Sequence, residues 1–419
     1  MMVTVHGKQF DLIIAGGGMV GASLACLLEK TSLSIALVDR AVFDSAEIPY
    51  QHHRSTDQPV FDPRVSAISK TSKDLFSELG LWQDISSKRC CGYGHMQVWD
   101  ADGTGSIQFS AAAIKQPELG TIIENSIISA ALHDRLSTIE NLQVIAPFTI
   151  DSVHEITVDG EPGVQLLSED GDVISAKLLV AADGANSRIR QLANFATREW
   201  DYHHQALVTT VRTEKAHNDT ALQRFMETGP LAFLPLYPDI DAEDQHFCSI
   251  VWSMLPEKAE QVLSLSDDQF RLQLAAAIEH KLGAVEWAGQ RLTFPLRQRH
   301  AVNYVQDNIV LVGDAAHTIH PLAGQGVNLG LLDVKVFAEE LQRGIQAGRH
   351  LADATVLRRY QRKRIGHNLG MMWLMEGFKH LFAEQQLPIR WLRNIGMSGA
   401  DNLVLVKNQL ARRAMGLDW

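Results

Sequence analysis

The stretch that decides the fold is Phe10-Asp11-Leu12-Ile13-Ile14-Ala15-Gly16-Gly17-Gly18-Met19-Val20-Gly21. Its first six residues predict a buried β-strand, and the glycines match the G-x-G-x-x-G pattern that leads from such a strand into a helix. In this pattern Gly16 permits a tight turn, Gly18 lets the backbone approach a pyrophosphate, and Gly21 lets the helix pack on the strand. The helix would then face the phosphates with unpaired N–H groups and its positive dipole end.

An acidic residue completes this dinucleotide motif. Residues 34–39 predict a second buried strand, which ends at Asp39. The carboxylate of Asp39 is placed to accept hydrogen bonds from the ribose hydroxyls of an adenosine. A strand–helix–strand unit with so short a crossover predicts a parallel sheet that is covered on both faces. The motif suits FAD and NAD equally, and the alternative interpretation is that the glycines only close a tight turn.

Two later strands also lead into acidic turns. Residues 178–182 precede Asp183-Gly184-Ala185-Asn186-Ser187-Arg188, and residues 309–312 precede Gly313-Asp314-Ala315-Ala316-His317. The glycine-rich run from His320 to Asp333 follows the second turn. An aspartate at the carboxyl end of a strand can reach ribitol hydroxyls above the sheet, and a glycine-rich turn that enters a helix exposes N–H groups to an anionic ring edge.

Composition and charge restrict the function classes. The chain has 419 residues, of which 46% are hydrophobic and 21% charged, as in an ordinary globular protein. The net charge of −11 argues against a nucleic-acid partner. Residues 343–419 nevertheless carry 13 Lys and Arg against 5 Asp and Glu, so this basic segment is +8 while the rest is −19. Such a segment indicates contact with an anionic membrane surface or an acidic partner, or else a solvated helical face.

The apolar run 369–382 inside this basic segment has two interpretations. It is either a helix that docks on a membrane surface or a partner, or a helix that packs in a homo-oligomer or against the rest of the chain. The chain shows no secretion signal and no membrane-spanning run, so we expect a cytoplasmic protein, with peripheral contact at the inner membrane as the open alternative. We expect free thiols at all four cysteines, which are Cys26, Cys90, Cys91 and Cys248. His317 and His320 lack the further ligands of a metal site, so we expect no metal.

The order of strand and helix patterns predicts a discontinuous dinucleotide domain of the α/β class with an inserted antiparallel sheet and C-terminal helices. Short strand-like runs at 206–213, 231–237 and 247–253 make up the insertion. Ser266 begins a capping box for a helix that extends to about Leu282. The expected boundaries are 1–75, 120–195 and 290–345 for the dinucleotide domain, 76–119 and 196–289 for the sheet lobe, and 346–419 for the helical region.

These motifs together resemble the single-component flavoprotein hydroxylases of the para-hydroxybenzoate-hydroxylase fold. The run H-P-L-A-G-Q-G-x-N-x-G-x-x-D at 320–333 is similar to the signature of the ubiquinone-biosynthesis hydroxylases, and the resemblance covers essentially the whole chain. Residues 200–213 and 414–417 are most similar to the 2-polyprenylphenol 5-hydroxylases and less similar to the sister 1- and 6-hydroxylases. Asp39 stands where FAD enzymes more often have Glu, and a shorter acid needs a slightly closer ribose.

The resemblance implies FAD as cofactor, bound in a Rossmann-like domain, and NAD(P)H as co-substrate. Arg64 would neutralise the pyrophosphate, and Asp183 and Asp314 would lie near the ribityl chain. Backbone donors at the start of the last helix would face the N1–C2 edge of the flavin, where its reduced form is anionic. The residues implied for FAD are Gly16, Gly18, Gly21, Asp39, Arg40, Arg64, Asp183, Gly313, Asp314, Gly324, Gln325, Gly326, Val327 and Asn328.

The reaction that the resemblance implies is hydroxylation of a lipid-tailed phenol with O2, through NAD(P)H-reduced flavin and a C4a-hydroperoxyflavin. Pro321, preceded by His320, would lie at the flavin face beside the substrate. The alternatives are a sister 6- or 1-hydroxylase of the same pathway, an isoprenoid reductase, or a non-catalytic FAD-bound scaffold in a biosynthetic complex. A ubiquinone-biosynthesis complex is a possible partner. The candidate residues for an apolar substrate channel, which could equally be ordinary core, are Phe225, Phe233, Leu234, Phe247, Val251 and Trp252.

Overall fold

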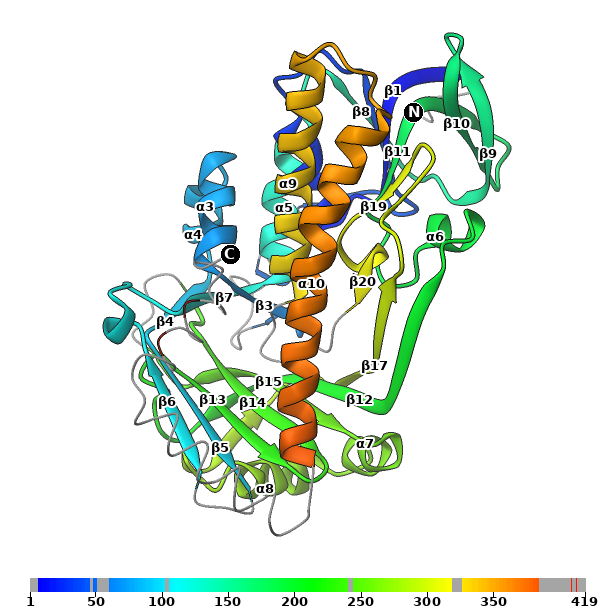
Figure 1. Ribbon diagram of the computed structural model, residues 1–419. Coiled ribbons are helices and arrows are strands. Elements are labelled where there is room, and N and C mark those ends of the chain that lie inside the picture. The colour runs from blue at the N-terminus through cyan, green and yellow to red at the C-terminus, as the bar shows by residue number, and fades with distance from the viewer. Residues whose placement is uncertain are drawn as a thin grey trace.

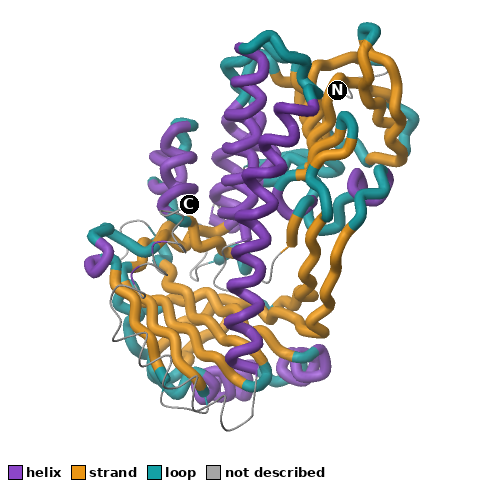
Figure 2. The backbone as a smooth tube through the Cα atoms, viewed as in Figure 1, coloured by secondary structure: helices purple, strands orange, loops and turns teal. Residues whose placement is uncertain are grey.

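The computed structural model describes residues 7–45, 48–50, 60–101, 105–239, 244–318, 326–383, 408 and 412, without the side chains of 201–202 and 374–383. Three sheets make up two lobes, one rich in helices and one built around a large antiparallel sheet (Figures 1 and 2). The long helix α10 (Ala354–Ala383) runs beside α9 (Gly326–Gln346) in the first lobe and continues past the large sheet.

The first lobe contains the predicted parallel sheet. Its main path has the order β18-β19-β11-β1-β2-β8, in which β19, β11, β1, β2 and β8 run parallel. Continuous apolar runs form these strands because helices and loops cover both faces of the sheet. The strands are β1 (Lys8–Ala15), β2 (Ile35–Val38), β8 (Leu142–Ile145), β9 (Ile150–Val158), β10 (Glu161–Ser168), β11 (Val173–Ala181), β18 (Val305–Gln306) and β19 (Ile309–Leu311).

Helices pack on this sheet and on one another. The helix after the glycine-rich loop, α1 (Met19–Leu27), lies between α5 (Asn125–Leu136) and α9, and all three contribute to the largest core cluster. Shorter helices occupy the connections, namely α3 (Lys70–Glu78), α4 (Trp82–Ser86) and α6 (Arg188–Leu192).

The second lobe is a nine-stranded sheet with the main order β20-β17-β12-β15-β14-β13-β5-β6. Helices α7 (Pro256–Leu263) and α8 (Asp267–Ala277) cover one of its faces and close a separate core. The strands are β5 (His95–Asp100), β6 (Ser106–Ser110), β12 (Thr197–Thr213), β13 (Thr220–Met226), β14 (Gly229–Leu236), β15 (Phe247–Met254), β16 (Val285–Ala288), β17 (Leu292–Ala301) and β20 (His317–Thr318).

A small sheet joins the two lobes. It consists of β3 (Val65–Ile68), β7 (Gly120–Glu124) and β4 (Cys90–Tyr93) in the order β3-β7-β4. Its apolar side chains share one buried cluster with the large sheet, to which β3, β4 and β7 contribute alongside β13, β14 and β15. We call this shared cluster the inter-lobe core, and the face of the large sheet that it covers the inner face.

The predicted fold class is confirmed, with differences at the ends of elements. Strand β12 has 17 residues and is longer than the predicted strand at 206–213, because both β15 and β17 pair along it. The capping box at Ser266 is present, but α8 ends at Ala277 rather than near Leu282. Strand β17 belongs to the large sheet rather than to the dinucleotide domain. The domain boundaries otherwise remain our proposal.

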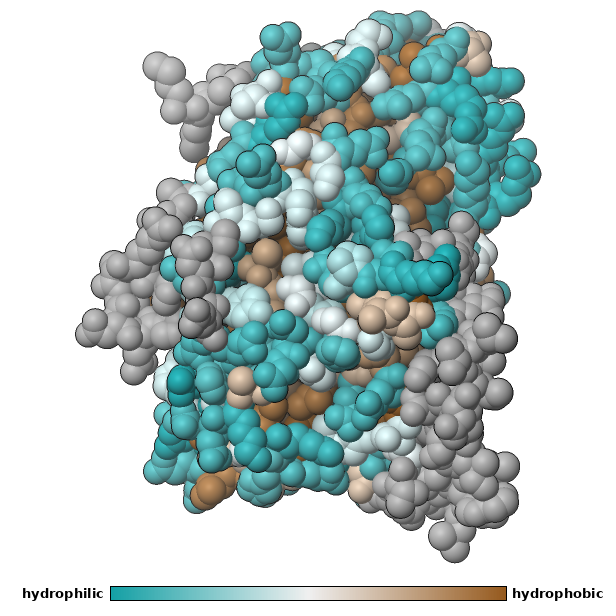
Figure 3. Space-filling model, turned by 90° about the vertical axis from the view of Figure 1, so that its left-hand side faces the viewer, coloured by the Kyte–Doolittle hydropathy of each residue, from teal (hydrophilic) through white to brown (hydrophobic). Residues whose placement is uncertain are grey.

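Figure 3 shows one side of the molecule, where the surface is mostly hydrophilic and apolar side chains are visible only in small patches. None of the helices within the described ranges combines the length and the apolar character that crossing a membrane requires. The four cysteines are free thiols, as expected.

Candidate functional site

The acidic and glycine-rich motifs meet at one edge of the parallel sheet. Strands β19, β11, β1 and β2 are neighbours in that order, and each motif follows the carboxyl end of its strand. Backbone hydrogen bonds fix the positions of neighbouring turns relative to one another. Ala182 N donates to Ala15 O at 2.7 Å, and Val312 N donates to Ala181 O at 3.0 Å. Ligands of open α/β sheets bind outside the carboxyl ends of the strands, so this edge is the candidate site.

The glycine-rich loop has the geometry that its sequence predicts. Gly16 has a φ of +105°, and a Cβ there would lie 2.4 Å from Ala182 O. A Cβ at Gly21 would lie 1.9 Å from Gly16 O, so the first turn of α1 packs directly on the loop. Gly18 is the N-cap of α1, and a Cβ there would meet nothing within 4 Å. The N–H groups of the helix therefore face open space beside Gly18, as a pyrophosphate requires.

Asp39 lies against this loop, and two residues that the sequence analysis missed support it. The Asp39 carboxylate accepts N–H hydrogen bonds from Gly17 at 2.7 Å and Ala41 at 2.9 Å, and each oxygen keeps a further lone pair. The His133 Nε2 lies 2.8 Å from Gly17 O, and its ring stacks on Phe43 at 4.0 Å. His133 is distant in sequence and belongs to no motif, so no local signal could have identified it.

Asp183 caps helix α6 with one carboxylate oxygen. That oxygen accepts the N–H groups of Arg188 at 2.8 Å and Ile189 at 3.2 Å. The other oxygen is buried and has no hydrogen-bond partner within the described parts of the chain. Desolvation raises the pKa of Asp183, and the hydrogen bonds from Ser187 and the backbone oppose this rise. A buried acceptor without a partner is rare in proteins, and a ligand hydroxyl would satisfy it.

Arg190 ties the two acidic turns together. Its guanidinium donates to Ala185 O beside Asp183 and to Ala315 O beside Asp314, at 2.8 Å in each case. Burial, and then the neighbouring Arg299, lowers the pKa of Arg190. Both turns are thereby fixed in one arrangement.

Asp314 lies in the turn η2 (Gly313–Ala315) after β19, where Gly313 has a φ of +57°. Solvent reaches the Asp314 side chain. Desolvation by the surrounding protein, together with the nearby charge of Asp333, raises the pKa of its carboxyl, while His317 opposes the rise. A carboxyl in this position can accept a hydrogen bond from a sugar hydroxyl above the sheet.

Asn328, at the start of α9, connects this edge to the segment 67–72, which follows Arg64 in the chain. Its amide donates to Ala67 O at 2.8 Å, and its oxygen accepts from Ser69 N at 3.0 Å and Ser72 Oγ at 2.7 Å. The side chain of Arg64, just before this segment, is exposed.

The other predicted cofactor residues divide into two groups. Arg40 is exposed, and Gly326 and Val327 are half-buried in the first turn of α9. The residues that lie outside the described parts of the chain are His320, Pro321, Gly324 and Gln325. The roles expected of these four residues remain proposals.

The predicted channel residues lie on two different faces of the large sheet. Leu234, Phe247 and Val251 belong to the inter-lobe core on the inner face, and Phe225 is on that face by strand alternation. Phe233 and Trp252 point the other way, into the core under α7 and α8. Phe233 and Trp252 therefore lie apart from the other four candidates, and the channel itself remains a prediction.

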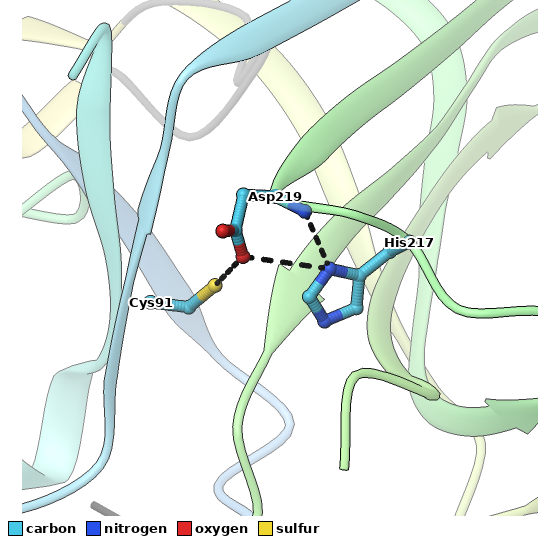
Figure 4. Close-up of side chains that lie close together, drawn as sticks. All are labelled: Cys91, His217 and Asp219. Atoms are coloured by element: carbon cyan, nitrogen blue, oxygen red, sulfur yellow. Dashed lines mark hydrogen bonds and ion pairs between the residues drawn. The ribbon is translucent and has the colours of Figure 1, made fainter. Parts of the chain in front are cut away.

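Figure 4 shows a cluster of Cys91 in β4 with His217 and Asp219, which directly precede β13, and the spacing of the three would suit a metal ion. The Nδ1 of His217 accepts the N–H of Asp219 at 3.1 Å, and its Nε2 lies 3.2 Å from Leu236 O. Desolvation lowers the pKa of His217, in keeping with a neutral ring. One ring nitrogen thus serves a turn in which Asn218 and Asp219 have positive φ, and the other faces β14, which explains the cluster without a metal.

The residues at the sheet edge fit FAD. The open N-terminus of α1 suits a pyrophosphate, Asp39 suits the adenosine ribose, and the unpartnered oxygen of Asp183 suits a further hydroxyl of the cofactor. The glycine motif with Asp39 would alone account for NAD, but it would leave the acidic turn at Asp314 unexplained.

Comparisons with known proteins agree with FAD as the cofactor. The family model described as "FAD binding domain" matches residues 9–368. The chain is 34% identical to 3-demethoxyubiquinol 3-hydroxylase of Escherichia coli (strain K12), over 97% of this chain and 98% of the relative. It is 32% identical to the mitochondrial ubiquinone biosynthesis monooxygenase COQ6 of Danio rerio, over 97% of this chain and 90% of the relative.

A solved structure shares the fold. The crystal structure of p-nitrophenol 4-monooxygenase PnpA from Pseudomonas putida DLL-E4 aligns with a TM-score of 0.73, covering 98% of this chain and 99% of that one at 16% identity. The sheet edge suits a dinucleotide, the family model describes an FAD-binding domain, and the relatives match along nearly their whole length. These findings lead to one assignment. The chain belongs to the family of FAD-dependent monooxygenases that contains these ubiquinone-biosynthesis enzymes.

Proposed function

We propose that this enzyme hydroxylates the aromatic ring of a polyprenylphenol in ubiquinone biosynthesis, and that the position attacked is C5. The observation that carries the substrate class is the apolar inner face, which lies across the inter-lobe core from β3, the strand that leads from Arg64 to Ser69. The substrate named for the relative from Escherichia coli is also a ubiquinone precursor. The similarity of residues 200–213 and 414–417 to the 5-hydroxylases supports the ring position.

The inner face combines apolar and hydroxyl side chains in rows across the strands. Thr210 of β12 is directly opposite Ser249 of β15, which is opposite Leu234 of β14. The hydroxyls of Thr210 and Ser249 are buried and have no hydrogen-bond partner in the described ranges. Apolar neighbours suit a lipid-tailed ring, and two hydroxyls without partners favour a ligand that carries its own polar groups.

FAD is the cofactor, and we propose that the edge residues Gly18, Asp39, Asp183 and Asp314 bind it, with Arg64 at the pyrophosphate. Once it is reduced by NAD(P)H, FAD supplies the activated oxygen that a phenol ring needs for hydroxylation. The protein holds the ring against the flavin and excludes water, because leakage of the oxidant would waste NAD(P)H. We propose that Pro321, next to His320, borders the substrate on the flavin side.

A second ring position has specific support. The relative with 34% identity over nearly all of both chains is named a 3-hydroxylase of 3-demethoxyubiquinol. The name places the attacked carbon at another position of the ring, for which the same fold and cofactor would serve. This second candidate therefore differs from the first only in the carbon that is attacked.

The exposed side of α10 supports contact with a membrane surface or a protein complex. Arg358, Arg362 and Trp373 are exposed at helical spacing, and 72% of Trp373 is accessible. Cationic and aromatic side chains on one side of a helix favour the interface of an anionic bilayer. We propose that this surface brings the enzyme to its lipid-tailed substrate.

Deletion of the gene separates the ring positions. Accumulation of a polyprenylphenol in the deletion strain is the result expected for a 5-hydroxylase, and complementation with the gene should restore ubiquinone. Accumulation of the demethoxy intermediate would assign the 3-position instead. Purified enzyme that oxidised NAD(P)H without hydroxylating either ring would overturn the proposed substrate class.

A further inference from the structure

A buried polar network lies behind the turn that carries Asp314 and joins α9 and α10 to it. Asp333 of α9 is 0% exposed and Arg364 of α10 is 2% exposed. The Arg364 Nε donates to Asp333 Oδ1 at 2.7 Å, and the Asn368 Nδ2 donates to the same oxygen at 3.1 Å. Two groups from α10 therefore hold one carboxylate oxygen of α9.

The other oxygen of Asp333 reaches the turn itself. Asp333 Oδ2 accepts the N–H of Gly313 at 3.0 Å and lies 2.5 Å from His317 Nε2. Gly313 directly precedes Asp314, and His317 follows it three positions later. The carboxylate of Asp333 thus clamps the acidic turn at both ends.

Close packing brings α9 against the same turn. A Cβ at Gly330 would lie 3.2 Å from the Gly313 Cα and 2.7 Å from a methyl of Val20 in α1. The turn, α1 and α9 therefore leave each other little freedom, and a shift of Asp333 would move the turn that presents Asp314.

The network has a single hydrogen-bond arrangement. Asn368 receives a hydrogen bond from Arg364 Nη2 at 2.7 Å, which fixes the orientation of its amide. The Asn368 Nδ2 also donates to the Tyr304 hydroxyl at 3.2 Å. Burial favours protonation of Asp333, but His317 and Arg364 outweigh it and hold its pKa well below the ordinary value. A buried ion pair that is fully hydrogen-bonded fixes geometry more than it adds stability.

We propose that Arg364, together with Asn368, is a positioning residue for FAD, because through Asp333 it fixes the turn that presents Asp314 to the cofactor. Neither Arg364 nor Asn368 belongs to a nucleotide-binding motif. The inference rests on the proposed contact between Asp314 and FAD and not on the ring position, so it stands or falls independently of the proposed substrate.

The test compares two ion pairs that both join α9 to α10. Lys363 directly precedes Arg364 in the sequence, and its Nζ lies 2.6 Å from Glu340 Oε1. This pair does not touch the acidic turn. We would prepare the full-length variants R364M and K363M, remove FAD, and measure FAD affinity by fluorescence titration and stability by thermal melting. R364M should bind FAD about tenfold or more weakly, since the buried carboxylate of Asp333 loses its link to Arg364 in α10, whereas K363M should bind FAD like the wild type.

Two milder variants keep the test decisive if R364M does not fold. R364K retains the charge and should restore part of the affinity, and N368S should give an intermediate loss. With FAD at saturation, the visible circular dichroism of the bound flavin should differ from the wild type in R364M and N368S but not in K363M. FAD affinities of R364K and N368S within twofold of the wild type, with melting temperatures lowered to the same extent as in K363M, would show that the network only joins the helices.

Discussion

The Arg89 Nε lies 2.9 Å from a carboxylate oxygen of Glu124, and both side chains are at most 2% exposed. This buried pair supports the segment that leads to Arg64. Arg89 donates to Val60 O at 2.7 Å, and Glu124 accepts the N–H of Asp62 at 2.6 Å. Asp62 in turn accepts the N–H of Arg64 at 2.9 Å. The chain that leads into the proposed pyrophosphate arginine is thus held from within the core.

We expect Arg89→Met to unfold the protein more easily and to weaken FAD binding. Removal of Arg89 takes from the buried Glu124 the cation that opposes the rise of its pKa to about 7, and breaking such a buried pair typically costs about 3–5 kcal/mol. Denaturant unfolding of the apoprotein measures the loss, and FAD titration measures the effect on the Arg64 segment. Arg135→Met is the control, because Arg135 forms a half-exposed pair with Glu29 at 2.6 Å, for which we expect about 1 kcal/mol or less. Equal losses in both variants would contradict the supporting role of Arg89.

Two glycines of the nucleotide loop should respond in opposite ways to alanine. In Gly21→Ala the added Cβ would lie 1.9 Å from Gly16 O, so we expect a protein that does not fold. In Gly18→Ala the Cβ meets no atom, and the φ of −65° suits alanine, so the apoprotein should melt like the wild type. The same Cβ would occupy the space for the pyrophosphate, and FAD affinity should fall by about tenfold or more. A Gly18→Ala enzyme with wild-type FAD affinity would mean that the pyrophosphate lies elsewhere.

The sequence predicted the nucleotide edge because its signals are local. Each acidic or glycine-rich turn directly follows an apolar strand, and parallel strands bring such turns to one edge. The ties between the turns are not local, since Arg190 reaches Ala315 across 125 positions. The sequence also could not predict which residues of β14 lie on which face of the sheet. Nearly every residue from Gly229 to Leu236 is buried and apolar, so no alternation is visible.

Arg190→Lys should weaken FAD binding. A lysine can reach only one of the two carbonyls that Arg190 joins, so the turns of Asp183 and Asp314 would lose their link. We expect FAD affinity to fall by about tenfold, the equivalent of one hydrogen bond to a charged group. Arg291→Lys is the control, since Arg291 contacts Leu265 O at 2.8 Å in the large-sheet lobe, far in sequence from the edge. A control that lost FAD equally would assign the effect to general destabilisation.

His300 should make the protein sensitive to acid. Burial, followed by the proximity of His317 and Arg198, lowers the pKa of His300 from 6.5 to about 4. The folded protein therefore favours the neutral ring, and this contribution to stability is complete above pH 6.5 and is lost as the pH falls towards 4. Between pH 7 and pH 5 we expect the wild type to lose roughly 2 kcal/mol through this group. His300→Gln should show a correspondingly smaller fall in urea unfolding, and identical pH profiles would exclude His300 as the cause.

The two faces of β14 provide a test of where the substrate lies. Leu234 belongs to the inter-lobe core, whereas Phe233 packs under α7 and α8. We expect Leu234→Ala to raise the KM for a short-chain prenylphenol and to release more hydrogen peroxide for each NAD(P)H oxidised, because the ring loses its support against the flavin. Phe233→Leu should lower the melting temperature and leave both kinetic quantities close to the wild type. If Phe233→Leu raised the KM and Leu234→Ala did not, the substrate would lie on the face of the large sheet that α7 and α8 cover. The inner face would then be ordinary core.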